Sequence, residues 1–375
     1  MERCDVLVVG GGPAGSSCAR RLHQAGMGVI VLDRSVFPRD KVCAGWITPQ
    51  VIDDLELDCD DYRRGRTFQP ITGFRTGVIG SAKALETVYD RPVSFGIRRC
   101  EFDHYLLLRS GADLRLGMVL SSIVRDGTCW IVNDSIKADV VIGAGGHFCP
   151  VARWLNPTID GAPPLVVAQE TEFRLEDRDA KAWPTASGVP ELYFCRDLSG
   201  YGWCFRKAQH LNIGFGLLGR RALPKATAEF VEFLRGQRRA PEEMSGRWHG
   251  HAYLVAASPH RQAIDDGVML LGDAAGLAYP ESGEGIRPAI ESGLLAASTL
   301  VAARGHYSRD RLEPYVRQLR ERFGSRRMRQ LRPRTMRSAV ANRLLPWLLG
   351  SRWFTRRLLL ERWFLHAHDS AMVNP

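Results

Sequence analysis

Two glycine-rich segments constrain the fold of this chain more than any other feature of its sequence. The first, residues 10–15, follows an apolar run at residues 5–9 and precedes residues 16–25, which are typical of a helix. A second apolar run, residues 28–32, ends on Asp33. Glycines in such a turn let the backbone approach a diphosphate at the positive end of a helix, while the acid binds ribose hydroxyls. The pattern predicts a Rossmann-type dinucleotide site that holds either NAD or FAD. The residues expected to contact the dinucleotide here are Gly10, Gly12, Pro13, Ala14, Gly15, Asp33 and Arg34.

The second glycine-rich segment, residues 271–276, distinguishes FAD from NAD. An apolar run at residues 268–271 leads Gly272 and Asp273 into a tight turn, where a carboxylate can bind a ribityl hydroxyl. Only a flavin dinucleotide has a ribityl chain. FAD is therefore the expected cofactor, and the alternative is that residues 10–15 form an ordinary strand–helix turn.

A third turn, residues 282–286, places Gly283, Gly285 and Ile286 at the expected start of a helix. Backbone N–H groups and a helix N-terminus there would face the N1–C2=O edge of a flavin, which gathers negative charge on reduction. Pro288 fits the first turn of that helix because it needs no N–H partner. A simple helix cap is the alternative, although a cap does not require two glycines flanking an acid.

Cysteine usage and hydropathy bound the class of protein. The 375 residues include nine scattered cysteines, an odd number without any Cys-x-x-Cys pair. This usage predicts reduced thiols in a cytoplasmic protein, with no disulfide framework and no metal site. We expect no signal peptide, because the first strand begins by residue 5, and no membrane span, because no apolar stretch reaches about 20 residues.

The positive charge of the chain is concentrated in its last part. The net charge is +10, yet residues 304–364 alone hold 17 arginines and four acids, so the remaining body is slightly acidic. Nucleic acid is therefore not an expected partner. Arginines alternate there with leucines and with Trp347, Trp353 and Phe364. Two interpretations stay open: a helix that lies in an anionic membrane interface, or a helical cap over the rest of the protein whose arginines face water.

The order of the signals predicts an α/β fold with interleaved domains. We expect a Rossmann-type FAD-binding domain, a mostly antiparallel β-sheet substrate domain and a basic helical C-terminal region. The expected boundaries are 1–70, 95–158 and 262–305 for the FAD-binding domain, 71–94 and 159–261 for the substrate domain, and 306–375 for the C-terminal region.

Four further blocks resemble the geranylgeranyl reductase family, within the p-hydroxybenzoate hydroxylase-like group of flavoproteins. Residues 37–45 are similar to its Pro-x-x-Lys-x-Cys-Gly-Gly element, and residues 99–106 to the group's Arg-x-x-Phe-Asp-x-x-Leu helix start. Residues 201–216 resemble the Tyr-x-Trp-x-Phe-Pro-Lys and Gly-x-Gly cavity motif. Residues 272–286 resemble the Gly-Asp-Ala-Ala-Gly through Gly-Glu-Gly-Ile element.

The resemblance implies roles for individual residues. Lys41, Cys43, Ala44, Arg99 and Gly145 are expected at the cofactor. Cys43 would lie in a loop that faces the flavin, where its thiol could act as proton donor or redox partner; a small buried hydrophobe is the alternative. Tyr201 and Trp203 share one face of a strand and are expected to form an aromatic wall of the substrate cavity, or else ordinary core. We therefore name Cys43, Tyr201 and Trp203 as candidate catalytic residues.

Two departures from the family pattern affect the predicted chemistry. Gly145 stands where the group has an acid, and Cys149 where it has a serine. In related hydroxylases that acid supports both FAD and reduced nicotinamide binding, which leaves the route of reduction open. Arg206 replaces the proline of the cavity motif, which leaves the substrate open.

The resemblance implies an FAD-dependent reductase that acts on carbon–carbon double bonds of an isoprenoid or similar apolar substrate, with NADPH or NADH as reductant. The main alternative is an FAD-dependent monooxygenase that hydroxylates a phenolic or lipid-tailed aromatic substrate, because the shared fold supports both chemistries. A flavin halogenase and a lipid-binding module with a vestigial flavin site are weaker alternatives. We expect a cytoplasmic enzyme with peripheral contact to an anionic membrane.

Overall fold

The computed structural model describes residues 1–375 apart from 158–164, 177–186, 220–222, 256–260, 325–346 and 370–375. Its strands form three sheets. The first sheet contains Glu2–Val9 (β1), Val29–Asp33 (β2), Asp113–Leu116 (β8), Ile123–Asp126 (β9), Cys129–Val132 (β10), Ile136–Gly143 (β11), Ile264–Asp265 (β17) and Val268–Leu270 (β18). The second contains Gly73–Val78 (β5), Ala84–Val88 (β6), Leu165–Arg174 (β12), Glu191–Phe194 (β13), Gly200–Lys207 (β14), His210–Leu218 (β15) and His249–Leu254 (β16). The third contains Trp46–Ile47 (β3), Gln69–Ile71 (β4) and Ser94–Gly96 (β7).

The described helices connect and cover these sheets. They are Pro13–Gln24 (α1), Pro49–Asp54 (α2), Cys59–Tyr62 (α3), Arg99–Leu108 (α4), Pro150–Leu155 (α5), Leu223–Gly236 (α7), Ile286–Ala303 (α8) and Arg309–Phe323 (α9). A short 3₁₀ turn, Gly272–Ala274 (η1), and a wide π-type helix, Phe354–Phe364 (η2), complete the set.

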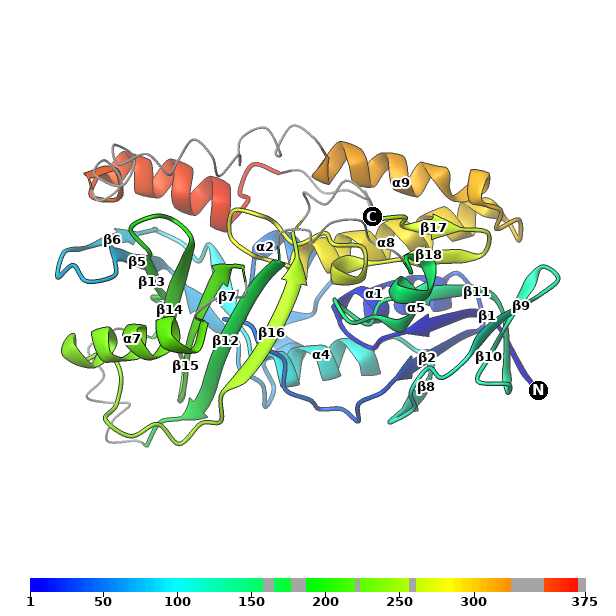
Figure 1. Cartoon of the computed structure of the whole chain (residues 1–375), viewed down its shortest axis with the longest axis horizontal. Coiled ribbons are helices and arrows are strands. Elements are labelled where there is room, and N and C mark those ends of the chain that lie inside the picture. Colours follow the sequence, from blue (N-terminus) through cyan, green and yellow to red (C-terminus); the bar gives the residue numbers. More distant parts are fainter. Residues whose placement is uncertain (158–164, 177–186, 220–222, 256–260, 325–346, 370–375) are drawn as a thin grey trace.

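The first sheet has the parallel order β18-β11-β1-β2-β8 expected of a Rossmann-type core. Its central strands are apolar on both faces because both faces are covered. Val6 and Val8 of β1 pack with α1, α8 and α9, whereas Leu7 and Val9 pack with α5 and strand β10. In Figure 1 this half, with α1, α8 and α9, lies beside the half built on the second sheet.

The second sheet is mostly antiparallel, and strand alternation gives its faces different partners. Tyr193 packs against α7, whereas its neighbour Phe194 packs on the opposite face. There the C-terminal helix η2 covers the sheet through Phe364 and neighbouring leucines, on the other side from α7 (Figure 1). The predicted fold class is confirmed: a Rossmann-type core, a mostly antiparallel sheet and a helical C-terminal region.

The helix start expected from residues 99–106 lies at Arg99, where α4 begins. Within the tail, Leu359, Leu360 and Phe364 are buried against the second sheet, as expected of a helical cap. Composition alone could not distinguish these cases, because burying an apolar face against protein or against lipid satisfies the same hydrophobic demand. Residues 325–346 of the basic tail lie outside the described residues.

Candidate active site

A cavity of about 1280 Å³ lies between the carboxyl edge of the first sheet and the inner face of the second. The cavity lies at the carboxyl end of β1, whose neighbours in the sheet are β2 on one side and β11 on the other. The strand order reverses at this point, and open α/β sheets bind their ligands at such reversals. The cavity is larger than the few hundred to about 1,000 Å³ typical of small-molecule sites. It therefore has room for a dinucleotide and part of a second molecule.

Almost all of the predicted site residues line this one cavity. Those that do are Gly10, Gly12, Pro13, Ala14, Asp33, Arg34, Lys41, Cys43, Ala44, Arg99, Gly145, Tyr201, Trp203, Asp273, Gly283, Gly285 and Ile286. Gly15 and Gly272 do not line the cavity; they belong to the glycine-rich turns next to it.

The first glycine turn combines glycines with different tasks. Gly10 has a φ of +119°, and a Cβ on Gly15 would overlap the carbonyl oxygen of Gly10, so both positions are fixed by the protein itself. Gly12 differs, because the nearest atom to a Cβ placed there is the flexible end of Arg39, at 3.4 Å. Gly12 begins α1 without any side-chain cap and borders the cavity. The N–H groups at the start of α1 therefore fit a diphosphate, and the space beside Gly12 fits its close approach.

Asp33 ends β2 beside this turn. Its two carboxylate oxygens accept hydrogen bonds from the backbone N–H groups of Gly11, at 2.7 Å, and Ser35, at 2.8 Å. The carboxylate thus orders the glycine turn. Each carboxylate oxygen can accept more than one hydrogen bond, so the arrangement also fits a ribose hydroxyl.

Asp273 faces two basic side chains across the cavity. His251 Nε2 lies 3.5 Å from Asp273 Oδ2, and Lys41 Nζ lies 2.5 Å from the same His251 nitrogen. Burial, opposed by the charge of Asp273, lowers the pKa of Lys41 to about 8. Burial disfavours the ionised form of Asp273 and acts to raise its pKa. The facing His251 and Lys41 outweigh this effect, so the pKa of the Asp273 carboxyl lies below its usual value. Asp273 is therefore an ionised acceptor in a low-dielectric site, which fits a sugar-alcohol hydroxyl.

The third turn leads into α8. Gly283 has a φ of +71°, and a Cβ there would collide with the hydroxyl of Tyr253. Gly285 begins the 18-residue helix without a side-chain cap, and Gly285 and Ile286 both line the cavity. The backbone N–H groups at this helix start fit the edge of a flavin that becomes negative.

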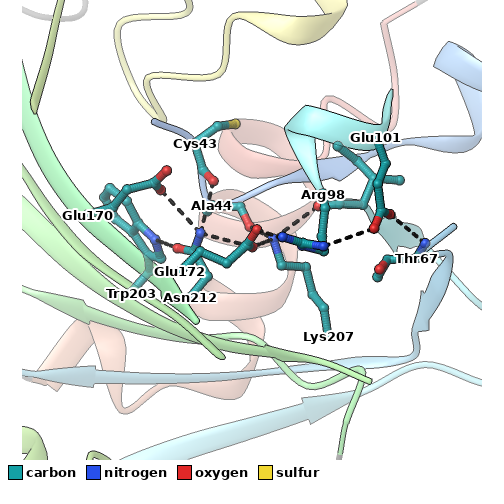
Figure 2. Close-up of polar contacts among 11 residues, drawn as sticks. Cys43, Ala44, Thr67, Arg98, Glu101, Glu170, Glu172, Trp203, Lys207 and Asn212 are labelled. Carbon is teal, nitrogen blue, oxygen red and sulfur yellow. Dashed lines mark hydrogen bonds and ion pairs between the residues drawn. The ribbon is translucent and has the colours of Figure 1, made fainter. Parts of the chain in front are cut away.

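The Cys43 loop is fixed by a buried polar network (Figure 2). Asn212 Nδ2 donates to the Cys43 carbonyl at 3.3 Å and to Glu170 Oε2 at 3.2 Å. Lys207, which is 1% exposed, donates to the Ala44 carbonyl at 3.1 Å and pairs with Glu172. Burial raises the pKa of Glu170 to about 8. The loop therefore holds the Cys43 thiol at the cavity on a rigid scaffold.

Tyr201 and Trp203 present their rings to the cavity and use their polar atoms elsewhere. The Tyr201 hydroxyl donates to the Ser282 carbonyl at 2.5 Å, and Trp203 Nε1 donates to Asn212 Oδ1 at 2.6 Å. Burial raises the pKa of Tyr201, so its phenol stays protonated. Both side chains therefore act as aromatic wall in this structure, joined by Trp46 and by Trp363 from η2.

Several residues of the cavity were not expected from the sequence. His251 and Trp363 carry no local signal, because strand register and the return of the tail bring them to the cavity. Glu170 and Glu172 did carry one: two acids two residues apart share a face of a strand that begins with four apolar residues, and buried acids rarely stay unpaired.

The position that departs from the family pattern also borders the cavity. A Cβ on Gly145 would lie 3.3–3.4 Å from three atoms of Cys149, the second departing residue. Restoring an acid at residue 145 would therefore require Cys149 to move. The two departures are one local change.

Comparison with known proteins now identifies the family. A family model described as FAD dependent oxidoreductase matches residues 5–83. A digeranylgeranylglycerophospholipid reductase of Methanothrix thermoacetophila is 28% identical over 355 residues, with 88% of this chain and 86% of that protein covered. A menaquinone reductase of Mycolicibacterium smegmatis is 30% identical over 325 residues, with 80% and 77% covered. The chain belongs to the geranylgeranyl reductase family.

A solved structure of this kind agrees in fold. The geranylgeranyl bacteriochlorophyll reductase-like protein of Thermoplasma acidophilum superposes with a TM-score of 0.77 over 93% of this chain and 91% of that one, at 21% identity. The protein is thus an FAD-dependent oxidoreductase of the geranylgeranyl reductase type, and the cavity described above fits the cofactor that this family uses.

Proposed function

We propose that this family member reduces carbon–carbon double bonds of an isoprenoid chain in the cavity described above. The observation that carries the proposal is the composition of the cavity. One end is made of glycine turns and helix N-termini that fit a dinucleotide, and the other is an aromatic wall that includes Tyr201, Trp203 and Trp363. An apolar wall suits an apolar chain and excludes water from the reacting atoms.

The residues have distinct tasks in this proposal. FAD, when bound, supplies the two-electron reduction, and NADPH or NADH is proposed as its source of electrons. The first glycine turn and Asp33 hold the dinucleotide, and Asp273 holds its ribityl part. Lys41 and His251 keep Asp273 ionised and oriented. Cys43 is held at the cavity by the network of Figure 2, where its thiol can give up a proton.

Anaerobic turnover with defined isoprenoids tests the proposal. The purified protein is loaded with FAD and reduced with dithionite. It is then mixed with geranylgeranyl diphosphate, a digeranylgeranylglycerophospholipid or menaquinone, and the masses of the products are measured by mass spectrometry. We expect at least one of the three to gain two hydrogens per reduced double bond, and a protein that has lost FAD to give no product. If the FAD-loaded enzyme leaves all three unchanged, while aerobic incubation hydroxylates an aromatic substrate, the monooxygenase alternative is correct.

We also propose that the enzyme acts at a membrane surface. No helix among the described residues is long and apolar enough to span a bilayer. In the C-terminal segment Trp347 and Trp353 are more than 70% exposed, and Arg352, which precedes Trp353 in the sequence, is exposed as well. Exposed tryptophan next to arginine suits the interface of an anionic bilayer, at about 1 kcal/mol for each basic side chain.

Vesicle flotation decides the membrane proposal. The full chain should float with anionic vesicles at low salt, and the double variant Trp347→Ser, Trp353→Ser should float far less while retaining its fold. Trp154→Ser, which alters a partly exposed tryptophan on α5, should float like the wild type. Equal flotation of all three proteins would show that Trp347 and Trp353 do not contribute to membrane binding.

The domain boundaries and the compartment expected from the sequence remain proposals. All nine cysteines are free thiols in the structure, which supports a reducing, cytoplasmic compartment.

A further inference from the structure

One face of strand β12 brings two acids to the cavity. The residues of this strand that line the cavity are Val166, Ala168, Glu170 and Glu172, and the residues between them do not line it. Successive side chains of a strand point to opposite faces, so the Glu170 side chain lies on the cavity face. Glu170 is also buried, with 6% of its surface exposed. The proposed function gives this acid no chemical task.

The aromatic wall approaches Glu170 across a glycine. Glu170 lies opposite Gly214 of β15, and Gly214 lies opposite Trp203 of β14. A Cβ on Gly214 would overlap the Trp203 indole, so the indole extends over this glycine in the direction of β12. The Asn212 amide joins the two side chains, because it accepts from Trp203 Nε1 at 2.6 Å and donates to Glu170 Oε2 at 3.2 Å (Figure 2). The carboxyl group of Glu170 is therefore held beside the wall at which an apolar substrate is proposed to bind.

The two acids of β12 have different charge states because their partners differ. Glu172 pairs with Lys207 at 2.5 Å and with Arg98 at 3.0 Å, and these cations hold the pKa of its carboxyl below the usual value. Glu170 has the neutral Asn212 amide as its hydrogen-bond donor, and burial raises its pKa to about 8. At neutral pH Glu170 therefore holds a proton while Glu172 is a carboxylate. Two neighbouring acids with pKa values pushed apart are typical of acid–base sites.

The other titratable groups around Glu170 come from several elements. The charge of Glu172 acts to raise the pKa of Glu170, and the charge of Lys207 on β14 acts to lower it. Arg98, before α4, binds Glu172 and Glu101 instead. His249 of β16 lies opposite Glu170 in the sheet and also lines the cavity. Opposite residues of antiparallel strands have neighbouring side chains, so a partly exposed imidazole lies next to this acid and can return protons to it from solvent.

We propose that Glu170 is the acid that protonates the substrate carbon. The proposal rests on the proposed function, in which each reduced double bond gains a hydride and a proton. The hydride carries both electrons to one carbon and comes from the cofactor chemistry. The O–H bond of Glu170 breaks as a C–H bond forms at the other carbon, and Glu170 is left as a carboxylate. It regains a proton from solvent before the next turnover.

Infrared spectroscopy of the FAD-loaded enzyme tests the charge state of Glu170 without any substrate. At pH 6 to 7 we expect a carboxylic C=O band that is absent from Glu170→Gln and that loses half its intensity near pH 8 in the wild type. A glutamine can still accept from Asn212, so this variant should keep the loop of Cys43 in place. The control Glu86→Gln alters an exposed acid of the same sheet and should leave the band unchanged. A band that survives Glu170→Gln would overturn the proposal.

Anaerobic turnover tests the proton transfer itself. The enzymes are saturated with FAD, reduced and mixed with a substrate identified by the turnover assay. We expect Glu170→Gln to bind FAD like the wild type, to reduce double bonds about a hundredfold more slowly and to lose the decline in rate that the wild type shows above about pH 8.

Three turnover results would overturn the assignment: an equal rate in Glu170→Gln, a slower rate that keeps the wild-type pH profile, or a loss of the pH-dependent step in Cys43→Ala alone, which would make the thiol the donor. A wild type that reduces no double bond at all would refute the proposed function, while the infrared titration would still decide whether Glu170 holds a proton at the cavity.

Discussion

Replacing Gly12 with valine should remove FAD binding without damaging the fold. Gly12 has φ −75° and ψ −177°, a conformation open to any residue, and the space beyond its Cα opens toward the cavity. A valine side chain there takes the position where a diphosphate meets the start of α1. Each charge-assisted hydrogen bond to a backbone N–H contributes about 2 kcal/mol, so losing two weakens binding by about 4 kcal/mol, or roughly a thousandfold in Kd.

A second glycine of the same turn provides the contrast. A Cβ on Gly15 would overlap the Gly10 carbonyl oxygen and approach Val8 within 3.0 Å, so Gly15→Val forces α1 away from β1. Overpacking of this kind costs about 1–3 kcal/mol. We expect Gly15→Val to lower the Tm of the FAD-free protein by about 2–4 °C per kcal/mol, whereas Gly12→Val should leave that Tm unchanged.

Calorimetric titration with FAD and thermal unfolding of the FAD-free proteins measure both effects. Near-normal FAD binding by Gly12→Val would refute this placement of the diphosphate. A drop in Tm as large as that of Gly15→Val would mean that Gly12 serves the fold rather than the ligand.

Three further predictions follow from other parts of the structure. FAD binding near pH 8 should take up protons, because an anionic ligand raises the lowered pKa of Lys41, so affinity falls as pH rises above about 8; titrations in buffers of different ionisation enthalpy should show this uptake in the wild type and lose it in Lys41→Met. Cys43→Ala should keep FAD but slow or redirect turnover, and unchanged turnover would make the thiol structural. Phe364→Ala, which empties a fully buried position under η2, should cost about 3–5 kcal/mol of unfolding free energy in a denaturant titration, and a loss below about 1 kcal/mol would contradict the cap.

The sequence predicted those parts of the site that depend on local backbone demands. Gly10 and Gly15 are required by a positive φ and by a close helix–strand contact, and such requirements leave a readable spacing. Asp273 and the turn at Gly285 could also be predicted, because each belongs to a short glycine-rich segment with a recognisable spacing. The backbone conformation of such a segment depends on its own residues, so these cavity residues could be named before the fold was known.

The remaining parts depend on contacts between distant segments. His251 reaches Asp273 only through the register of β16 against β12, and His366 reaches Glu284 only because the chain returns from η2 to α8. The tail illustrates the same limit. Its arginines and leucines are compatible with a bilayer or a cap; the packing of Leu360 and Phe364 on the second sheet shows the cap, and membrane contact of the exposed side chains stays a proposal.

In the proposed reaction, electrons pass from FAD in this cavity to an isoprenoid double bond. The most direct measurement is anaerobic and stoichiometric: the FAD-loaded enzyme is reduced with dithionite, excess reductant is removed, and a substrate identified by the turnover assay is added while the flavin spectrum is followed. We expect the oxidised spectrum to return only when substrate is present, with one double bond reduced for each FAD reoxidised. A flavin that stays reduced until oxygen is admitted would contradict it.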